Sequence, residues 1–453
     1  MLEMLDDMID DDYDIVIIGS GLGGLTAASI LSRKGFKTLV VESRSRIGGR
    51  FSTFEYEGFK LPTGAILIPD GWVVKLLEEM GIKTNILRPI TRVYYRIDGE
   101  RYEIPSEIGV PKALDIIDKL ERKDAEEKKR PTKPVELSKI MRGYYKKMRG
   151  INQEEIITVR DWLLQYTENE KVHDAFDTLC TGLMMAHSWE LPVSKFFLFQ
   201  EMTKFYISPD GNLSIAKELA RVVEKTGAIW TNSPARKIMI KEGKATSVIV
   251  EKAGKQIEIK CKIVISNTGA KSTVSLAGKE NFDNEYLEKM RIKLRPSPCL
   301  LVLIASDKPL CLEGINDGLE IIMGSRRIKT VIPISNICPE LVPPGQHLIY
   351  TSAKSESTLH PMDIKYEMQQ VKSDIREFFP DFEKHGRILK MRACGIINEW
   401  PEGRTWLGYG MPLETPISNL FNVGDSCIAP GLIGTPGSVE SGYRLVDIVE
   451  KVL

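Results

Sequence analysis

The sequence predicts an α/β fold in which a parallel sheet flanked by helices is interrupted by a second domain of mixed strands and helices. Residues 14–18 form a β-branched run, and a glycine-rich turn and a helix-periodic segment connect it to a second apolar run, Thr38–Val41. Asp98-Gly99, between two β-rich runs, signals a hairpin that breaks this βαβ pattern. The strand–turn–helix order returns at residues 419–449, so the first domain is expected to be assembled from separate pieces of chain.

The turn after the first strand reads Gly19-Ser20-Gly21-Leu22-Gly23-Gly24, a G-x-G-x-x-G pattern between a strand and a helix. Gly19 permits the tight turn, Gly21 lets the backbone approach a pyrophosphate, and Gly24 lets the helix pack on the strand. The helix N-terminus offers free N–H groups and a positive dipole end to phosphates. Glu42, at the end of the second strand, is placed to bind a ribose diol. Together these features predict a Rossmann-type dinucleotide site.

A basic loop containing two glycines follows this acid directly, with Arg44, Arg46, Gly48, Gly49 and Arg50. One interpretation is a basic surface loop with an ordinary glycine turn. The position of the loop straight after Glu42 favours the other interpretation. In that case a second backbone turn and its cationic side chains surround the same pyrophosphate.

With the G-x-G-x-x-G turn, the acid and the R-x-G-G-R element, the sequence resembles the FAD-dependent amine oxidase and phytoene desaturase superfamily. Within it, the carotenoid desaturase-related oxidoreductases are the most similar. The resemblance implies FAD as cofactor, with Glu42 on the adenosine ribose and residues 48–50 near the flavin pyrophosphate. It covers residues 13–65, 208–270 and 392–453 and is weaker between them.

The closing segment carries a third motif, a strand that ends on Gly424-Asp425 ahead of a glycine-rich loop and a helix predicted from Glu440. A plain turn is the alternative. The resemblance implies that Asp425 meets the ribityl or phosphate region, and that the backbone around Gly437, Ser438 and Val439 faces the flavin O2/N1 edge. Cys427 is interpreted as a small apolar loop residue rather than a covalent flavin link. The remaining residues expected at FAD are Leu22, Gly23, Ser43, Arg44, Thr63, Gly64, Ala65, Ala235 (through its backbone, to adenine), Asn267 and Gly424.

The resemblance also implies two domains that alternate along the chain. We expect the FAD-binding domain at residues 1–70, 208–275 and 392–453, and an inserted α+β substrate domain at 71–207 and 276–391. Further strands are predicted in the first domain at 228–231, 235–240, 246–251 and 261–265, and in the second at 294–305, 321–323, 330–333 and 347–353.

Composition narrows the class of protein. The chain has 453 residues, of which 42% are hydrophobic, and its 62 basic residues balance its 62 acidic ones, so nothing favours a nucleic-acid partner. Seven scattered cysteines without a C-x-x-C pair predict the reduced thiols of a cytoplasmic protein, and the dispersed histidines predict no metal site. The acidic N-terminus does not resemble a secretion signal, and no apolar run approaches the ~20 residues that span a bilayer.

Residues 112–150 are the most polar part of the chain, with 13 Lys and Arg against 7 Asp and Glu. Within them, residues 138–149 interleave apolar and basic side chains. Peripheral contact with an anionic membrane surface is one interpretation. A solvated helix with a core-facing stripe is the favoured one. The oligomeric state stays open.

Residues 180–206 are rich in Met, Phe and Leu and suit either the wall of an apolar cavity or an ordinary core. His187, beside Trp189, is interpreted as a satisfied buried histidine rather than a catalyst. If the segment is a wall, the side chains expected to form an apolar substrate tunnel are Met184, Met185, Phe196, Phe197 and Phe205.

A single dinucleotide fingerprint means that hydride passes between an organic substrate and the flavin, without a separate NAD(P) domain. The resemblance implies desaturation, saturation or isomerisation of C–C bonds in an isoprenoid- or carotenoid-like substrate. A flavin amine oxidase is one alternative. Those relatives carry a lysine in the strand corresponding to residues 298–305, which has none here, and Gly-Glu where this chain has Gly424-Asp425. A non-enzymatic prenyl-protein binding module of the GDP-dissociation-inhibitor type is another, and the intact cofactor segments argue against it.

The candidate catalytic residues lie just before the last cofactor motif. Glu399, Trp400, Arg404 and Tyr409 are predicted to line the flavin face. A surface loop is the alternative, because residues 401–403 have ordinary turn chemistry.

Overall fold

The computed structural model describes most of the chain. The described residues are 12–97, 100–105, 110–128, 157–193, 196, 204–294, 298–310, 318–356, 362–394, 410–428, 432 and 434–453. Several sequence predictions lie outside them: the turn at Asp98-Gly99, the basic segment 138–149, Phe197, and the four candidate catalytic residues Glu399, Trp400, Arg404 and Tyr409.

The first of two large sheets is mostly parallel. Its strand order is β10 (Ala228–Trp230), β2 (Thr38–Val41), β1 (Asp12–Ile18), β13 (Lys255–Ser266), β12 (Lys244–Lys252) and β11 (Ala235–Lys241), with β19 (Leu420–Asn422) beside β13. β10, β2, β1, β13 and β19 run parallel, whereas β11 and β12 extend β13 as an antiparallel meander. The βαβ unit predicted from the N-terminal sequence is therefore present, and the predicted α/β class is confirmed.

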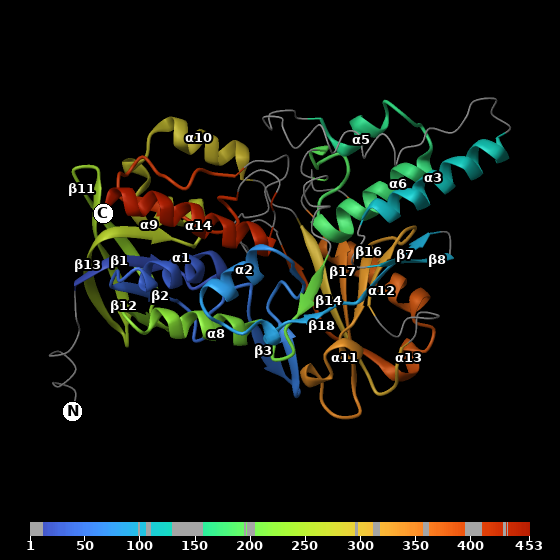
Figure 1. Cartoon of the computed structure of the whole chain (residues 1–453), viewed down its shortest axis with the longest axis horizontal. Coiled ribbons are helices and arrows are strands. Elements are labelled where there is room, and N and C mark those ends of the chain that lie inside the picture. Colours follow the sequence, from blue (N-terminus) through green and yellow to red (C-terminus); the bar gives the residue numbers. More distant parts are fainter. Residues whose placement is uncertain are drawn as a thin grey trace.

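Three helices pack together over this sheet: α1 (Leu22–Arg33), α8 (Asn212–Val223) and α14 (Gly434–Val452). Figure 1 shows α1 between the other two, so the N-terminal, middle and C-terminal pieces of the chain lie side by side in one lobe. Helix α1 has the Ala- and Gly-rich surface that such close packing needs, and every residue from Leu22 to Ser32 is buried.

Helix α14 corrects one sequence prediction. It begins at Gly434 rather than at Glu440, so Gly437, Ser438 and Val439 lie in its first turns and not in a preceding loop. Glycine is a poor helix former, which is why the sequence pattern places the start too late. Close packing explains why the helix has glycine at position 437, because a Cβ on Gly437 would lie 2.5 Å from a side-chain atom of Ile428.

The second sheet is mixed. Its order is β18 (Gly386–Cys394), β14 (Cys299–Ser306), β17 (His347–Lys354), β16 (Ile328–Pro333), β15 (Leu319–Ile322), β7 (Arg92–Ile97) and β8 (Glu100–Pro105). β7 and β8 pair antiparallel, which confirms the predicted hairpin, while β15 runs parallel to β7. Strands distant in sequence thus form one surface.

Both faces of the second sheet are covered, and β14 shows why. Leu300, Val302 and Ile304 belong to the core under α12 (Ile364–Phe378), whereas Leu303 and Ala305 belong to the core on the opposite face. This is the period-two alternation of a strand buried on both sides. The opposite face is covered by α5 (Val159–Leu163) and α6 (Glu170–Leu179), with α3 (Val110–Glu127) beyond them, and the sheet forms the second lobe in Figure 1.

Shorter elements connect the two lobes or extend them. They are β3 (Thr53–Tyr56), β4 (Phe59–Pro62), β5 (Ile68–Pro69), α2 (Trp72–Glu79), β6 (Arg88–Pro89), β9 (Phe205–Ile207), α9 (Ala270–Ala277), α10 (Asn284–Lys293), α11 (Ile334–Ile337) and α13 (Phe382–His385). Strands of the first sheet come from residues 12–41, 228–266 and 420–422, and those of the second from 92–105 and 299–394. The domain boundaries drawn from the sequence stay a prediction. In the part of the chain that the structure describes, no helix combines the length and apolar character needed to cross a membrane.

Candidate active site

A groove opens at the carboxyl ends of β1, β2, β13 and β19, the edge of a parallel sheet at which ligands bind in open α/β folds. All three predicted cofactor segments contribute to it. It is lined by Gly19, Gly21, Leu22, Gly23, Glu42, Ser43, Arg44, Gly48, Gly49, Arg50, Phe51, Thr63, Ala65, Asn267, Thr268, Gly269, Arg392, Val423, Asp425, Ser426, Gly434, Thr435 and Ser438.

The two glycine loops of the first segment contact each other through their backbones. Gly21 forms a parallel bridge with Gly48, and the Gly48 N–H donates to the Ser20 carbonyl at 2.9 Å. Gly19 and Gly48 both have a φ above 90°, a conformation that favours glycine. The Thr63 hydroxyl donates to the Gly49 carbonyl at 2.9 Å and so supports the second loop from below. The two glycine loops therefore lie against each other at the groove, and their shared contact with a pyrophosphate stays a prediction.

Glu42 is buried at the end of β2, and its carboxylate is fixed by the first loop. The Ser20 N–H and hydroxyl donate to one oxygen at 3.0 and 2.6 Å, and the Arg44 N–H donates to the other at 2.9 Å. An acid held this firmly at the groove suits the ribose-binding role predicted for it.

Asn267 connects the three segments. With its amide oriented to satisfy both neighbours, its oxygen accepts from the Gly21 N–H at 2.9 Å and its nitrogen donates to the Val423 carbonyl at 3.2 Å. A Cβ on Gly21 would lie 2.4 Å from this amide. The second glycine of the fingerprint is thus required for the approach of Asn267 as well as for that of a ligand.

Arginines outnumber acids in the lining of the groove, three to two. Arg44, Arg50 and Arg392 line it against the acids Glu42 and Asp425. The N-termini of α1 and α14 also open onto it, and neither helix has an acidic residue in its first turn. Helix N-termini and arginines together favour a bound phosphate.

Six of the residues expected at FAD do not line the groove, and three of these contact residues that do. Gly24 would place a Cβ 2.4 Å from the Gly19 carbonyl, and Gly64 one 2.9 Å from that of Arg50. Gly424 adjoins Asn267, whereas Gly437 and Val439 pack inside α14 and its core. Ala235 begins β11, and among the described residues it is not part of the groove lining, so its contact with adenine stays a prediction.

The structure also adds groove residues that the sequence reasoning missed. Thr268 and Gly269 follow Asn267 directly, and Thr435 lies in the first turn of α14. Their positions next to predicted cofactor motifs could have identified them as groove residues. Arg392 is the first residue of the third predicted cofactor segment, but no motif marked it as a site residue; it lies on β18 and reaches the groove from the second sheet.

Cys427 is fully enclosed next to the groove. Burial raises the pKa of its thiol to about 12, although contacts with Ser426 and Arg444 act in the opposite direction. The thiol accordingly stays protonated, which fits its interpretation as a small apolar residue. Cys180, Cys261, Cys299 and Cys338 likewise form no disulfide bond.

The predicted apolar wall belongs to the core between the second sheet and α6. Met184, Phe196 and Phe205 are buried in that core, and Met185 forms a smaller cluster with Cys299 and Leu301. The smaller cluster is next to the groove, because Leu301 pairs directly with Arg392 across β14 and β18. The histidine interpretation is confirmed: His187 is buried, and both ring nitrogens have partners.

These residues fit FAD. The groove is lined by two glycine loops, a fixed carboxylate, arginines and two helix N-termini, and it leads toward an apolar cluster. Glu42 and Arg44 suit the adenosine end, Gly21, Gly48 and Arg50 the pyrophosphate, and Asp425 and Ser438 the flavin end.

Comparison with known proteins agrees with this geometry. The family model of flavin-containing amine oxidoreductases matches residues 22–449. The chain is 25% identical to an uncharacterized protein from Methanocaldococcus jannaschii, over 97% of this chain and all of the other, and 24% identical to the chloroplastic prolycopene isomerase of Daucus carota, over 93% and 77%. The solved structure of an oxidoreductase from Methanosarcina mazei aligns with a TM-score of 0.77 at 25% identity, over 96% and 99% of the two chains. This chain belongs to the flavin-containing amine oxidoreductase family, and its cofactor is FAD.

Proposed function

We propose that the protein is an FAD-dependent oxidoreductase that desaturates, saturates or isomerises C–C bonds of an apolar, isoprenoid- or carotenoid-like substrate. When bound, FAD supplies two-electron hydride chemistry; the protein supplies the cavity, the orientation of the substrate and the electrostatics. The proposal goes beyond the family, whose members share the cofactor and differ in substrate.

One observation supports the apolar substrate above all others. Leu301 and Cys299 of β14 form an apolar cluster with Met185 beside the cofactor groove, and the charged cross-strand neighbours of this cluster are Arg392, opposite Leu301, and Lys354, opposite Cys299. Alternate residues of a strand face the same side, and Leu301 is the direct cross-strand neighbour of the groove residue Arg392. A substrate next to the flavin would therefore meet an apolar surface here, which suits a hydrocarbon chain.

The similarity to a prolycopene isomerase over most of both chains also supports this proposal. Amine oxidation is the second candidate, favoured by the description of the family. The strand β14 (Cys299–Ser306) has no lysine, which weakens that candidate. The non-enzymatic prenyl-protein binding alternative loses its basis, because it requires a chain without FAD.

The test is anaerobic reaction of the FAD-loaded protein with two sets of compounds. The apolar set consists of phytoene, a poly-cis lycopene and all-trans-retinol in detergent micelles, and the amine set of benzylamine and putrescine. We expect bleaching of the flavin absorbance, or product isomers by chromatography after reduction with dithionite, in the apolar set alone. Bleaching by an amine together with no reaction in the apolar set would overturn the proposal.

A further inference from the structure

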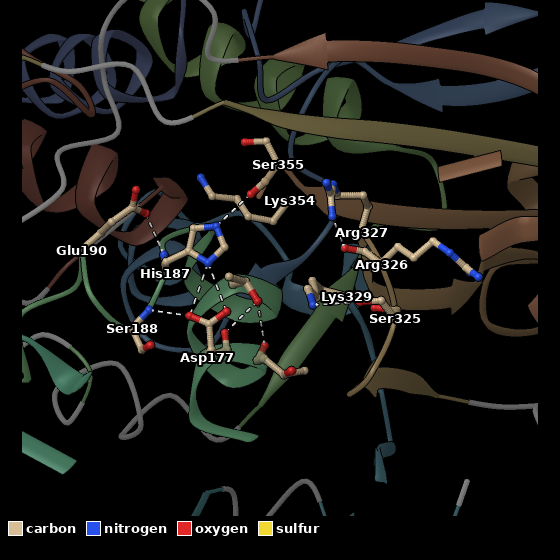
Figure 2. A network of polar contacts seen from close by, with 12 residues as sticks. Asp177, His187, Ser188, Glu190, Ser325, Arg326, Arg327, Lys329, Lys354 and Ser355 are labelled. Atoms are coloured by element: carbon tan, nitrogen blue, oxygen red, sulfur yellow. Dashed lines mark hydrogen bonds and ion pairs between the residues drawn. The ribbon is translucent and has the colours of Figure 1, made fainter. Parts of the chain in front are cut away.

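A buried histidine with a full set of partners lies behind the apolar cluster. The His187 ring contacts the Asp177 carboxylate through Nδ1 at 3.1 Å and the Ser355 carbonyl through Nε2 at 2.8 Å. Its backbone N–H donates to the buried Glu190 carboxylate at 2.8 Å. Trp189 stacks on the ring, with 4.1 Å between centroids and 8° between planes. Figure 2 shows His187 within this network, between the second sheet and the loop of residues 185–190 to which it belongs.

Both partners of the ring are hydrogen-bond acceptors. A neutral imidazole has one N–H and can donate to only one of them, whereas an imidazolium donates to both. The contacts are satisfied together when His187 is a cation with Asp177 as its counter-ion. Asp177 in turn also accepts from the Ser188 N–H at 2.7 Å, so the ion pair fixes the backbone of the loop as well as the ring.

The loop follows an irregular piece of helix. Helix α6 continues as a π-helix, Cys180–Met184, and Met185 then adopts a left-handed conformation with φ 56° and ψ 32°. A left-handed methionine is disfavoured by its own Cβ and persists only where the surroundings hold it. The His187 network begins two residues later and connects this turn to α6 through Asp177 and to β17 through the residue after it, Ser355.

The left-handed turn decides where the Met185 side chain lies. Met185 packs against Cys299 and Leu301, at the end of β14 nearest the groove. Leu301 is paired with Arg392, which lines the cofactor groove. A continuous chain of contacts therefore leads from the ion pair, through the strained turn, to a mostly buried apolar cluster whose Leu301 is the cross-strand neighbour of the groove residue Arg392.

We propose that His187 is a positioning residue for the substrate. Paired with Asp177, it holds the turn at Met185 and thereby places the Met185–Leu301 surface against which an apolar substrate rests beside the flavin. The inference rests on the proposed function for its substrate class. It assigns His187 no contact with the reacting atoms, so binding of the substrate, rather than binding of the flavin, depends on it.

The test compares His187→Gln, Asp177→Asn, the double variant and Met185→Ala with the wild type, all loaded with FAD. His173→Gln is the matched control, because His173 lies on α6 and its ring contacts only the Thr167 carbonyl among the contacts described, at 2.9 Å. Affinity for an apolar chain is measured with cis-parinaric acid, a fluorescent polyene. The alkylation rate of Cys299 by N-ethylmaleimide, measured on its peptide by mass spectrometry, gives a readout that needs no substrate.

We expect His187→Gln, Asp177→Asn and Met185→Ala each to weaken parinaric acid binding by about 5- to 20-fold, while the flavin spectrum and FAD affinity stay within about twofold. Cys299, which is almost fully buried, becomes alkylated at least about tenfold faster in the two ion-pair variants. The double variant matches the single ones, because both remove the same interaction. His173→Gln behaves as wild type.

Two results would overturn the inference. One is wild-type polyene affinity and Cys299 reactivity in His187→Gln. The other is unchanged polyene affinity in Met185→Ala, which would show that Met185 is not part of the binding surface. If the wild type binds FAD but no polyene, the proposed substrate class fails, and Cys299 alkylation alone then decides whether His187 holds the turn.

Discussion

The Arg50 guanidinium lies 2.6 Å from the Asp425 carboxylate, although 375 positions separate the two residues along the chain. Arg50 is the last residue of the R-x-G-G-R loop, and Asp425 follows the strand of the third cofactor motif. The ion pair therefore connects the first and the third cofactor segments at the groove. Both side chains are only partly exposed, at 28% and 20%. The pair therefore holds in place two groups that the cofactor also needs.

Removing this pair is expected to affect the cofactor more than the fold. Asp425→Asn removes the carboxylate charge that faces Arg50 and should weaken FAD binding about tenfold, equivalent to roughly 1.4 kcal/mol. A partly exposed ion pair contributes only about 0–1 kcal/mol to stability, so the melting temperature of the FAD-free protein should change little. Titration of the FAD-free protein with FAD measures the affinity. Glu450→Gln, which removes the Lys34–Glu450 pair on the surface, is the control and should leave FAD affinity unchanged.

Glu42 is expected to be the most sensitive single side chain of the groove. Glu42→Gln keeps the shape but loses the charge that accepts from Ser20 and Arg44. Because hydrogen bonds to a charged group contribute about 1.5–3 kcal/mol, FAD affinity should fall by roughly 10- to 100-fold. Glu55→Gln, an exposed change on β3, should have no effect on the same titration. Equal affinities for Glu42→Gln and wild type would remove Glu42 from the ribose-binding role.

A substitution of Gly23 tests how closely the first and third cofactor segments must approach each other. A Cβ there would lie 2.8 Å from the Gly424 Cα and 2.9 Å from its nitrogen, and backbone atoms cannot rotate away. Gly23→Ala should therefore cost about 1–3 kcal/mol of stability, as overpacking does, and reduce the flavin content on purification. Gly182→Ala is the comparison, since the nearest atom to a Cβ there is a methyl carbon of the Thr330 side chain at 3.3 Å. Thermal unfolding should rank Gly182→Ala nearer the wild type.

Sequence reasoning found the cofactor site where chemistry forces a local pattern. A turn that must approach a pyrophosphate needs glycine at Gly19 and Gly21, and the parallel strands around it put Glu42, Asn267 and Asp425 at one edge of the sheet. These requirements fall on short runs of neighbouring residues. The runs could therefore be recognised without knowledge of the tertiary structure.

The rest of the site is set by contacts between distant segments, which leave no local pattern. Arg392 lies on β18 of the second sheet and lines the groove from there, and no motif in the neighbouring sequence indicates this, although the third predicted cofactor segment begins at this residue. The start of α14 was predicted too late for a related reason. Gly437 and Gly442 lower helix propensity, but they allow close packing on Ile428 and Thr26, and tertiary packing outweighs propensity.

The Cys427 thiol should be unreactive, and the flavin should be bound non-covalently. Burial raises the pKa of this thiol to about 12, so the reactive thiolate is scarce at neutral pH. Acid precipitation of the holoprotein should release all of the flavin into the supernatant, and Cys427→Ala should retain as much flavin as the wild type. Flavin that stays with the precipitated wild-type protein but not with Cys427→Ala would contradict the expectation and indicate a covalent link.

Asp177 should make the fold sensitive to acid. Burial acts to raise the pKa of this carboxyl, but hydrogen bonds from the His187 ring and the Ser188 N–H outweigh burial and hold the pKa below its usual value. Because the folded pKa is the lower one, ionised Asp177 stabilises the fold. This contribution is fully present above the unfolded-state pKa of about 3.9 and is lost as the pH falls through the folded value.

The corresponding experiment measures thermal midpoints of wild type and Asp177→Asn between about pH 7 and pH 3. We expect the variant to be less stable by about 1.5–3 kcal/mol at neutral pH, the usual contribution of a charged buried hydrogen bond, and the difference to narrow below about pH 4. Thr181→Val, on the same stretch of chain, removes the Thr181 hydroxyl, which does not titrate in this range and donates to the Asp177 carbonyl at 2.7 Å. Its difference from wild type should not depend on pH. A wild-type advantage over Asp177→Asn that stays constant down to pH 3 would mean that the Asp177 charge does not contribute to stability.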